Sequence, residues 1–385
     1  MNYFLRLSLV SLVVGILPTS AQAIDISGKG ITLELGATTR TYNTGTVLAP
    51  ILTSVELWVF CESGSSSTWG CKQSPLDFPG PILEMGMDTS EDVVLNLLQS
   101  PRNPVPNESA AQAGYVANFT GHTMHFANLD LPQNFDGVPA PFPPVPNTVS
   151  NNNLDQIYTL NLLPLINPNH VGSHAYYCHV HQTKHVEMGE FGALIVHPVD
   201  KDGKFLNYIN QYAAAAVNPV TFDVETNFIL STIDPNYHKI TSVGDSPVFA
   251  AYNPTIFLVN GEQGLSAATP AAAITARTGD LVVIRLIGMH SVNATFEIID
   301  SAPLTPGPQP FAVHNIDGWA QPSPRITNKV ELSPGQTKDI LVTMPPDATT
   351  WYPVVTYTHL REFVDINGNP TVKVLGKVLS TITIE

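Results

Sequence analysis

The sequence predicts an all-β protein made of two β-sandwich domains in tandem. The 385 residues include 33 prolines and 26 glycines, which interrupt long helices and favour short strands joined by turns. Short runs rich in β-branched and aromatic residues recur along the chain, and the series restarts after residue 200. A hydrophobic fraction of 43% is enough for packed cores, so a disordered chain is excluded.

The expected strands fall into two series, each interrupted by turn sequences such as Pro79-Gly80-Pro81 and Asp136-Gly137. The first series comprises Gly30–Arg40, Ser54–Phe60, Val93–Leu97, Gln156–Leu163 and Phe191–Val196. The second comprises Phe222–Leu230, Ala273–Ala276, Leu281–Ile287, Phe296–Ile299, Val330–Leu332, Ile340–Thr343, Val354–Thr358 and Val378–Ile384. We therefore expect domain 1 at residues 24–200, a linker at 201–222 and domain 2 at 223–385. An alanine-rich stretch at 212–217 is expected to form a short helix in the linker.

Residues 1–23 have the features of a signal peptide. Arg6 is the only charge, residues 7–17 are almost wholly apolar, and Ala21-Gln22-Ala23 fits a cleavage site of small residues. A membrane anchor is the alternative, but the apolar run is short and no later segment has about 18 unbroken apolar residues. We expect an exported protein, periplasmic or secreted, without membrane insertion.

The charge balance excludes one class of partner. The chain has 32 acidic and 17 basic residues, a formal net charge of -15. Such a protein does not hold nucleic acid or an anionic membrane surface by bulk electrostatics.

Three cysteines indicate one disulfide and one thiol with another role. Cys61 and Cys71 flank a loop rich in glycine and serine, and an oxidising compartment favours their pairing. The alternative is that both are unpaired buried thiols. Cys178 is then left over, and an exported free thiol is a liability unless it is buried or bound to metal.

Histidines gather around this third cysteine and in one other segment of domain 1. His179 and His185 follow Cys178, and His122 and His125 lie earlier in the chain. On a strand, Cys178 points away from the face that carries His179. One thiolate and two imidazoles are a donor set for copper, with zinc as the competing metal. The alternative is a group of surface and core histidines beside an inert thiol.

With their neighbouring residues, these motifs resemble those of two-domain multicopper oxidases and, more distantly, of copper nitrite reductase. The resemblance is carried by Pro79-Gly80-Pro81-Ile82, by residues 122–128, by Tyr177-Cys178-His179 with residues 185–196, and in domain 2 by residues 314–318 and 332–342. It covers nearly the whole chain after residue 23. The resemblance implies two cupredoxin-like domains with Greek-key topology.

The resemblance also implies a type 1 copper held by His122, Cys178 and His185. The axial position, usually methionine in this family, falls on Glu190, while Met188 lies nearby but offset. Either side chain is a candidate for the fourth donor. A carboxylate is a harder donor than a thioether, so Glu190 would favour Cu(II) and lower the reduction potential.

The trinuclear cluster of multicopper oxidases is degenerate in this chain. Ala127 and Tyr177 stand where histidines are expected, and only His125, His179 and His359 remain at cluster positions. In two-domain relatives the cluster forms between neighbouring subunits. The trio is therefore a candidate for a single second copper at the interface of a homotrimer; the alternative is that the three are relic histidines satisfied by hydrogen bonds.

Together these features predict an exported copper-dependent oxidoreductase. Electrons from a small reductant or a redox protein would enter at the type 1 copper and pass through Cys178 and His179 to the second site. One alternative is a copper-binding electron-transfer protein with the type 1 site only and no oxidase turnover. Another is a structural pair of sandwiches that binds no metal.

Overall fold

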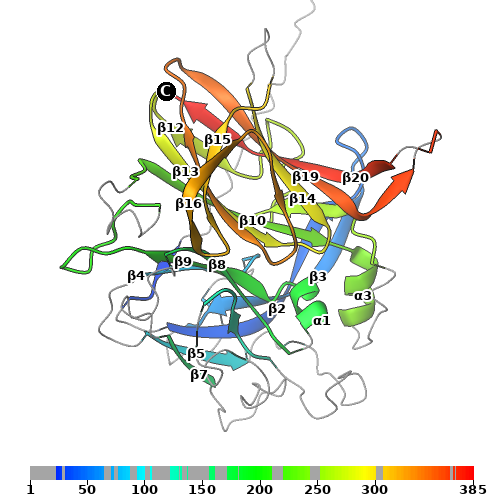
Figure 1. The fold of residues 1–385 in the computed structure, drawn as a ribbon. Coiled ribbons are helices and arrows are strands. Elements are labelled where there is room, and N and C mark those ends of the chain that lie inside the picture. Colours follow the sequence, from blue (N-terminus) through cyan, green and yellow to red (C-terminus); the bar gives the residue numbers. More distant parts are fainter. Residues whose placement is uncertain are drawn as a thin grey trace, which may run out of the picture.

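The computed structural model consists mainly of β-strands, with two short helices among the described residues, which confirms the all-β prediction (Figure 1). The described residues are 23–27, 31–64, 71–72, 77–86, 93–99, 105, 122–129, 131, 137, 156–160, 171–180, 182–209, 220–242, 252–300, 307–364, 367–368 and 370–385. The expected signal peptide, apart from Ala23, and the alanine-rich stretch 212–217 lie outside them. Neither described helix has the length and apolar character that crossing a membrane requires.

Domain 1 packs two sheets against each other. One sheet has the order β1 (Ile24–Asp25), β4 (Ile82–Gly86), β9 (Phe191–His197), β8 (Gly172–Tyr177) and β6 (His125–Phe126); the other has the order β3 (Leu52–Glu62), β2 (Ile31–Asn43), β5 (Val93–Gln99) and β7 (Gln156–Leu160). Because side chains alternate between the faces of a strand, one face of each sheet supplies a common core. The rings of Phe60 and Tyr176 meet across this core with their centroids 5.6 Å apart.

Domain 2 repeats this architecture of two packed sheets. One sheet has the order β11 (Ile256–Val259), β10 (Val224–Ile233), β13 (Leu281–Met289), β18 (Thr337–Thr343), β15 (Phe311–Ile316) and β16 (Trp319–Thr327). The other has the order β12 (Ala273–Ala276), β21 (Thr381–Ile384), β19 (Thr349–Val364), β14 (Asn293–Asp300) and β17 (Val330–Leu332), and β20 (Pro370–Leu379) pairs with β19. Phe228 and Phe296 pack between the two sheets.

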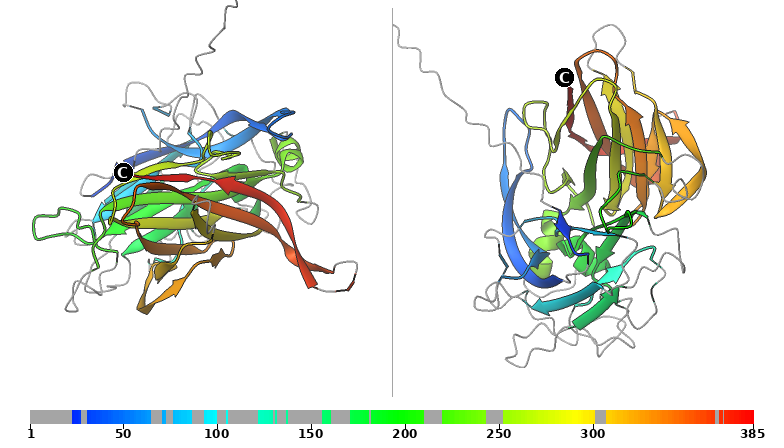
Figure 2. Two further views of the ribbon diagram at one scale, coloured as in Figure 1. Left: turned by 90° about the horizontal axis from the view of Figure 1, so that it is seen from above. Right: turned by 90° about the vertical axis from the view of Figure 1, so that its left-hand side faces the viewer.

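The two domains share an apolar interface. Leu57 and Ile195 of domain 1 and Ile229 and Ile287 of domain 2 belong to one buried cluster. The β2–β3 hairpin also rises from domain 1 alongside domain 2 (Figure 2). At that point Asn43 exchanges two hydrogen bonds with the side chain of Gln263 in domain 2, at 2.8 and 2.7 Å.

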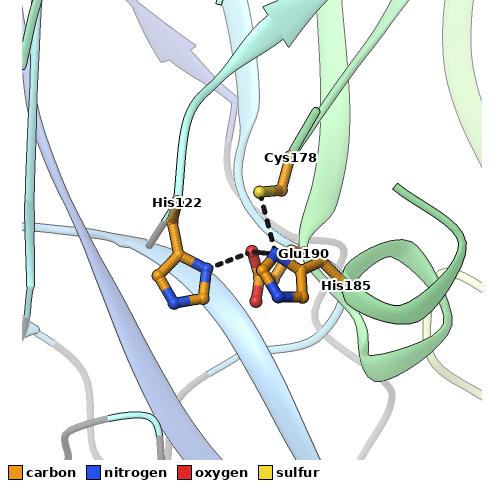
Figure 3. A group of neighbouring side chains, drawn as sticks. All are labelled: His122, Cys178, His185 and Glu190. Atoms are coloured by element: carbon orange, nitrogen blue, oxygen red, sulfur yellow. Dashed lines mark hydrogen bonds and ion pairs between the residues drawn. The ribbon is translucent and has the colours of Figure 1, made fainter. Parts of the chain in front are cut away.

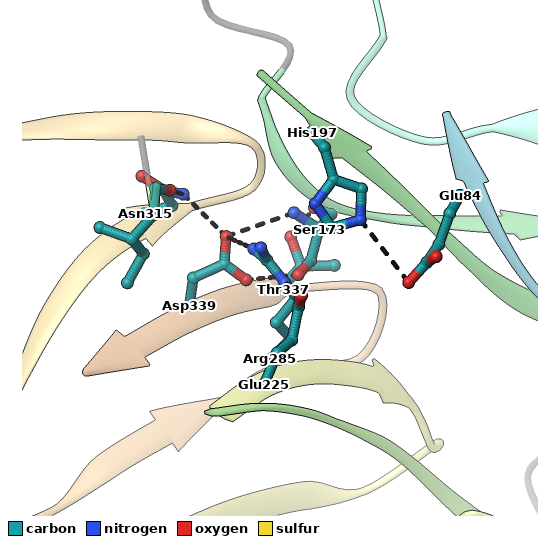
Figure 4. A network of polar contacts seen from close by, with 9 residues as sticks. Glu84, Ser173, His197, Glu225, Arg285, Asn315, Thr337 and Asp339 are labelled. Atoms are coloured by element: carbon teal, nitrogen blue, oxygen red, sulfur yellow. Dashed lines mark hydrogen bonds and ion pairs between the residues drawn. The ribbon is translucent and has the colours of Figure 1, made fainter. Parts of the chain in front are cut away.

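A buried polar network adds to this interface (Figure 4). Asp339 of β18 accepts hydrogen bonds from the Asn315 amide at 2.7 Å, from the backbone N–H of Ser173 at 3.3 Å, and from the Ser173 hydroxyl. Nη1 of Arg285 lies 3.0 Å from Asp339 Oδ2, and Nε of Arg285 donates to Glu225. Ser173 belongs to β8 of domain 1, so Asp339 links the two domains through paired and hydrogen-bonded charge.

The helices and several strands were not expected. Helix α1 (Gln182–Met188) lies between β8 and β9, and helix α3 (Pro235–Ser242) follows β10. Strand β8 was missed because its sequence, Gly-Ser-His-Ala-Tyr-Tyr, begins with small and polar residues rather than an apolar alternation. Its side chains are nevertheless almost all buried, because one face meets the core of domain 1 and the other meets domain 2.

The buried imidazole of His290 predicts a loss of stability in mild acid. Burial lowers the pKa of His290 to about 4, below its ordinary value of 6.5. Between these two values the unfolded chain binds a proton that the folded protein excludes, so stability is lost as the pH falls from 6.5 towards 4. From pH 7 to pH 5 this one residue is expected to cost about 2 kcal/mol of unfolding free energy.

Urea unfolding of the native protein and of His290→Gln at both pH values measures this effect. The variant should lose about 2 kcal/mol less on acidification. Equal losses in the two proteins would contradict the assignment.

Candidate metal centre

Four buried side chains converge inside domain 1 (Figure 3). They are His122, Cys178, His185 and Glu190; each offers one possible ligand atom, and these atoms all lie within 4.8 Å of one another. All four residues are 0% exposed. Within the part of the chain that the structure describes, no other group of three or more His, Cys, Asp or Glu side chains converges in this way.

The shortest contacts in this group are between atoms that can each bind a metal ion. His122 Nδ1 lies 2.8 Å from Glu190 Oε2, and His185 Nδ1 lies 3.1 Å from Cys178 Sγ. The same carboxylate oxygen lies 3.5 Å from His185 Nδ1. Both imidazoles thus turn Nδ1 towards the centre, and their rings stack with centroids 4.6 Å apart.

The centre is assembled from the segment before β6 and from the connection between β8 and β9. His122 lies just before β6, and Cys178 directly follows β8. His185 lies on α1, and Glu190 stands in the short turn between α1 and β9. Because β6, β8 and β9 are neighbours in one sheet, residues at these strand ends are brought together although 68 positions separate the first from the last.

A turn at Gly189 directs the Glu190 carboxylate into the centre. Gly189 has a φ of 114°, which L side chains rarely adopt, and a Cβ there would lie 2.8 Å from the Trp58 carbonyl oxygen. The turn lets the Glu190 N–H donate to the His185 carbonyl at 3.0 Å, while the Cys178 N–H donates to the Glu190 carbonyl at 3.1 Å. The backbone therefore ties three of the four donor residues to one another.

One wall of the centre is formed by Trp58, which the sequence did not single out. Its ring packs edge-on against His185 and His122, with centroid distances of 5.7 and 6.4 Å. The Lys184 ammonium lies 6.0 Å from the Trp58 ring centroid. Trp58 reaches the centre from β3, the opposite sheet of domain 1, so the imidazoles are held between the two sheets. Nothing in the local pattern indicates this role, because an apolar tryptophan in a strand is equally well explained by core packing.

The electrostatics of the centre favour a bound cation. Burial, and next the nearby Glu190 charge, raise the pKa of the Cys178 thiol well above its ordinary value. Oε1 of Glu190 is buried and has no hydrogen-bond partner among the described residues. A metal cation would satisfy this oxygen and stabilise the thiolate, so the residues present fit a metal site. The backbone N–H of Thr123 lies 3.5 Å from the sulfur as a weak donor.

The two candidate axial side chains occupy different places. Glu190 extends its carboxylate between the two imidazoles. Met188, the last residue of α1, is buried in the apolar core of domain 1, the same core cluster that contains Cys178. Glu190 is therefore the candidate whose donor atom lies with those of His122, Cys178 and His185, and we take it as the fourth donor.

The predicted second site is only partly assembled within one chain. The rings of His125 and His179 meet with centroids 4.8 Å apart, and the Tyr177 ring lies 5.1 Å from that of His125. His359 lies on β19 in domain 2 and forms no converging donor group with them among the described residues. Contribution of His359 by a second subunit stays a prediction.

The structure confirms the predicted disulfide and the predicted third, unpaired cysteine. Cys61 and Cys71 form a disulfide, and Cys178 is free and buried.

No protein-family model matches the chain, and no curated protein sequence matches it. Solved structures match nearly its whole length. The multicopper oxidase mgLAC matches with 16% identity and a TM-score of 0.56, over 94% of this chain and 87% of mgLAC. A blue copper oxidase from Nitrosomonas europaea matches with 16% identity and a TM-score of 0.56, over 94% of this chain and 86% of that oxidase. The McoA multicopper oxidase from the hyperthermophile Aquifex aeolicus matches with 13% identity and a TM-score of 0.53, over 95% of this chain and 64% of McoA.

These identities are low, so the similarity is one of fold. It extends across both sandwich domains, and it confirms the cupredoxin-like architecture that the motifs predicted. The chain therefore has a multicopper oxidase-like fold.

Proposed function

We propose that this protein is an exported copper-dependent oxidoreductase of the multicopper oxidase type, with copper held by His122, Cys178, His185 and Glu190. The observation that carries the proposal is the convergence of one thiol, two imidazole Nδ1 atoms and one carboxylate in a fully buried space. The multicopper oxidase-like fold supports it. Bound copper would supply a one-electron couple, Cu(I)/Cu(II), at this place.

The donor set favours copper over the hard cations Ca²⁺ and Mg²⁺. A thiolate and two imidazoles suit both oxidation states of copper, whereas Ca²⁺ and Mg²⁺ prefer an all-oxygen environment. Zinc accepts the same donors, so redox behaviour is the property that separates the two metals. Burial of all four donors excludes water from the centre, and the packing of Trp58 against both imidazoles restricts their rearrangement.

Glu190 is expected to hold the reduction potential low. A carboxylate is a hard, charged donor and stabilises Cu(II) relative to Cu(I). Replacing Glu190 by methionine should therefore raise the potential, and spectroelectrochemical titration of the copper-loaded proteins measures it. Met188→Leu is the matched control and should leave the potential close to that of the native protein. An unchanged potential in Glu190→Met would show that the carboxylate is not a ligand.

The proposal extends to a second site. Cys178 and His179 are consecutive, so a short covalent path joins the first centre to the paired rings of His125 and His179. We propose that His359 from a neighbouring subunit completes a mononuclear copper site there, in a homotrimer. The electron donor would be a small reductant or a redox protein.

Electron transfer without dioxygen turnover is the second candidate. It is favoured because one converging donor group, rather than several, is found among the described residues. Anaerobic reduction of the copper-loaded protein with ascorbate, followed by admission of air, tests both candidates. The oxidase predicts reoxidation with continuous dioxygen consumption while ascorbate lasts; the electron-transfer protein predicts one reduction without sustained consumption. A protein whose bound copper is not reduced would contradict both.

A further inference from the structure

We propose that Tyr252 of domain 2 is a positioning residue for the metal centre of domain 1, acting through Glu187 on helix α1. The inference rests on the proposed function only in taking the centre to be a metal site. It assigns to domain 2 a direct influence on the geometry of a site to which it contributes no ligand.

Helix α1 carries His185 and has buried side chains in two directions. Met188 packs into the apolar core of domain 1, and His185 faces Cys178. Glu187 is 6% exposed and its carboxylate is hydrogen-bonded to the phenol of Tyr252. A helix of seven residues is too short to be stable alone, so these side-chain contacts determine where it lies.

The phenol of Tyr252 is itself fixed by domain 2. The Thr232 hydroxyl lies 3.1 Å from the phenol oxygen and can donate to it, which leaves the single phenol hydrogen for Glu187. The backbone next to it is held as well, because the N–H of Asn253 donates to Asp234 Oδ2 at 2.8 Å. Both Thr232 and Asp234 belong to the end of β10 and the segment that follows it. Contacts within domain 2 therefore hold in place the phenol that Glu187 meets.

Loss of the phenol hydroxyl would leave the buried carboxyl group of Glu187 without its side-chain hydrogen-bond partner. Oε2 of Glu187 has no hydrogen-bond partner among the described residues, so Tyr252 is the side chain that compensates its burial. A buried polar group deprived of its partner moves towards water or another donor. Such a shift of α1 would change the 3.1 Å separation of His185 Nδ1 and Cys178 Sγ, two atoms of the centre.

Cobalt(II) substitution tests the inference, because its ligand-field bands report the geometry of the bound donors without any redox step. In Tyr252→Phe we expect shifted ligand-field and thiolate charge-transfer bands. We also expect transfer of Co²⁺ to a chelator to be faster, by no more than about tenfold, the lower end of the effect of removing a ligand's own hydrogen-bond partner. Tyr237→Phe is the matched control: it removes the same hydroxyl from a ring 5.7 Å away and should match the native protein in both measurements.

If Tyr252→Phe has the same ligand-field bands and the same Co²⁺ release rate as the native protein, the inference is overturned, even if its melting temperature is lower. Equal changes in both tyrosine variants would also overturn it. If Tyr252→Phe does not fold, Thr232→Val is tested in its place. We expect it to change the bands and the Co²⁺ release rate in the same direction but by less. Native bands and a native release rate in Thr232→Val would count against the inference. Failure of the copper-loaded protein to cycle between oxidation states would remove the proposed function but would leave the cobalt result standing.

Discussion

Replacing Cys178 by serine is expected to abolish copper binding at the centre and the stabilisation that copper confers. A ligand that binds only the folded state, present at about a thousandfold excess over its dissociation constant, stabilises the fold by about 4 kcal/mol. Chelation should therefore lower the melting temperature of the native protein and leave that of Cys178→Ser unchanged. Calorimetry with and without chelator, together with copper quantitation, measures both effects.

Met188→Leu is the matched control for this substitution. It changes a buried side chain of the same core cluster while nearly conserving volume, which usually costs less than about 1.5 kcal/mol. Copper content and charge-transfer absorption should persist in this variant. Equal copper content in the native protein and Cys178→Ser would contradict the assignment of the sulfur as a donor.

Replacing Arg285 by methionine is expected to destabilise the protein by about 3–5 kcal/mol, because it removes one partner of a buried charge network. Arg285 is 0% exposed and lies between Asp339, which is 1% exposed, and Glu225. Without the guanidinium, the Asp339 charge would depend on the hydrogen bonds from Asn315 and Ser173 within the described part of the chain. Since Ser173 belongs to domain 1, weakening of the contact between domains should accompany the loss.

Arg277→Met supplies the control, because Arg277 is exposed and surface substitutions usually change stability by less than about 0.5 kcal/mol. Urea unfolding of both variants at neutral pH measures the difference. An Arg285→Met protein as stable as Arg277→Met would show that the network contributes little. Hydrogen exchange at β8 and β18 should rise in Arg285→Met and not in Arg277→Met.

The sequence predicted those parts of the fold that depend on local pattern. Runs rich in β-branched and aromatic residues at Leu281–Ile287 and Phe296–Ile299 indicated strands, and β13 and β14 contain these residues. The Cys61–Cys71 pairing followed from two cysteines flanking a short loop. The donor residues of the metal centre came from a resemblance between motifs, not from periodicity.

Other features depend on tertiary contacts and had no local signature. Helix α1 is seven residues long and is held by the packing of its buried side chains rather than by its own propensity. The choice between Glu190 and Met188 depends on the Gly189 turn, whose φ cannot be read from spacing. The network around Asp339 joins residues more than 160 positions apart, and no pattern along the chain indicates such a contact.

Optical and electron paramagnetic resonance spectra of the copper-loaded protein, with copper quantitation, test the central assignment most directly. A sulfur donor beside two imidazoles and a carboxylate predicts at least one copper per chain, an intense thiolate-to-copper absorption and a Cu(II) resonance, with both signals lost in Cys178→Ser. Copper that binds in equal amount to the native protein and that variant, without thiolate absorption, would show that the buried group at residues 122, 178, 185 and 190 is not a copper site.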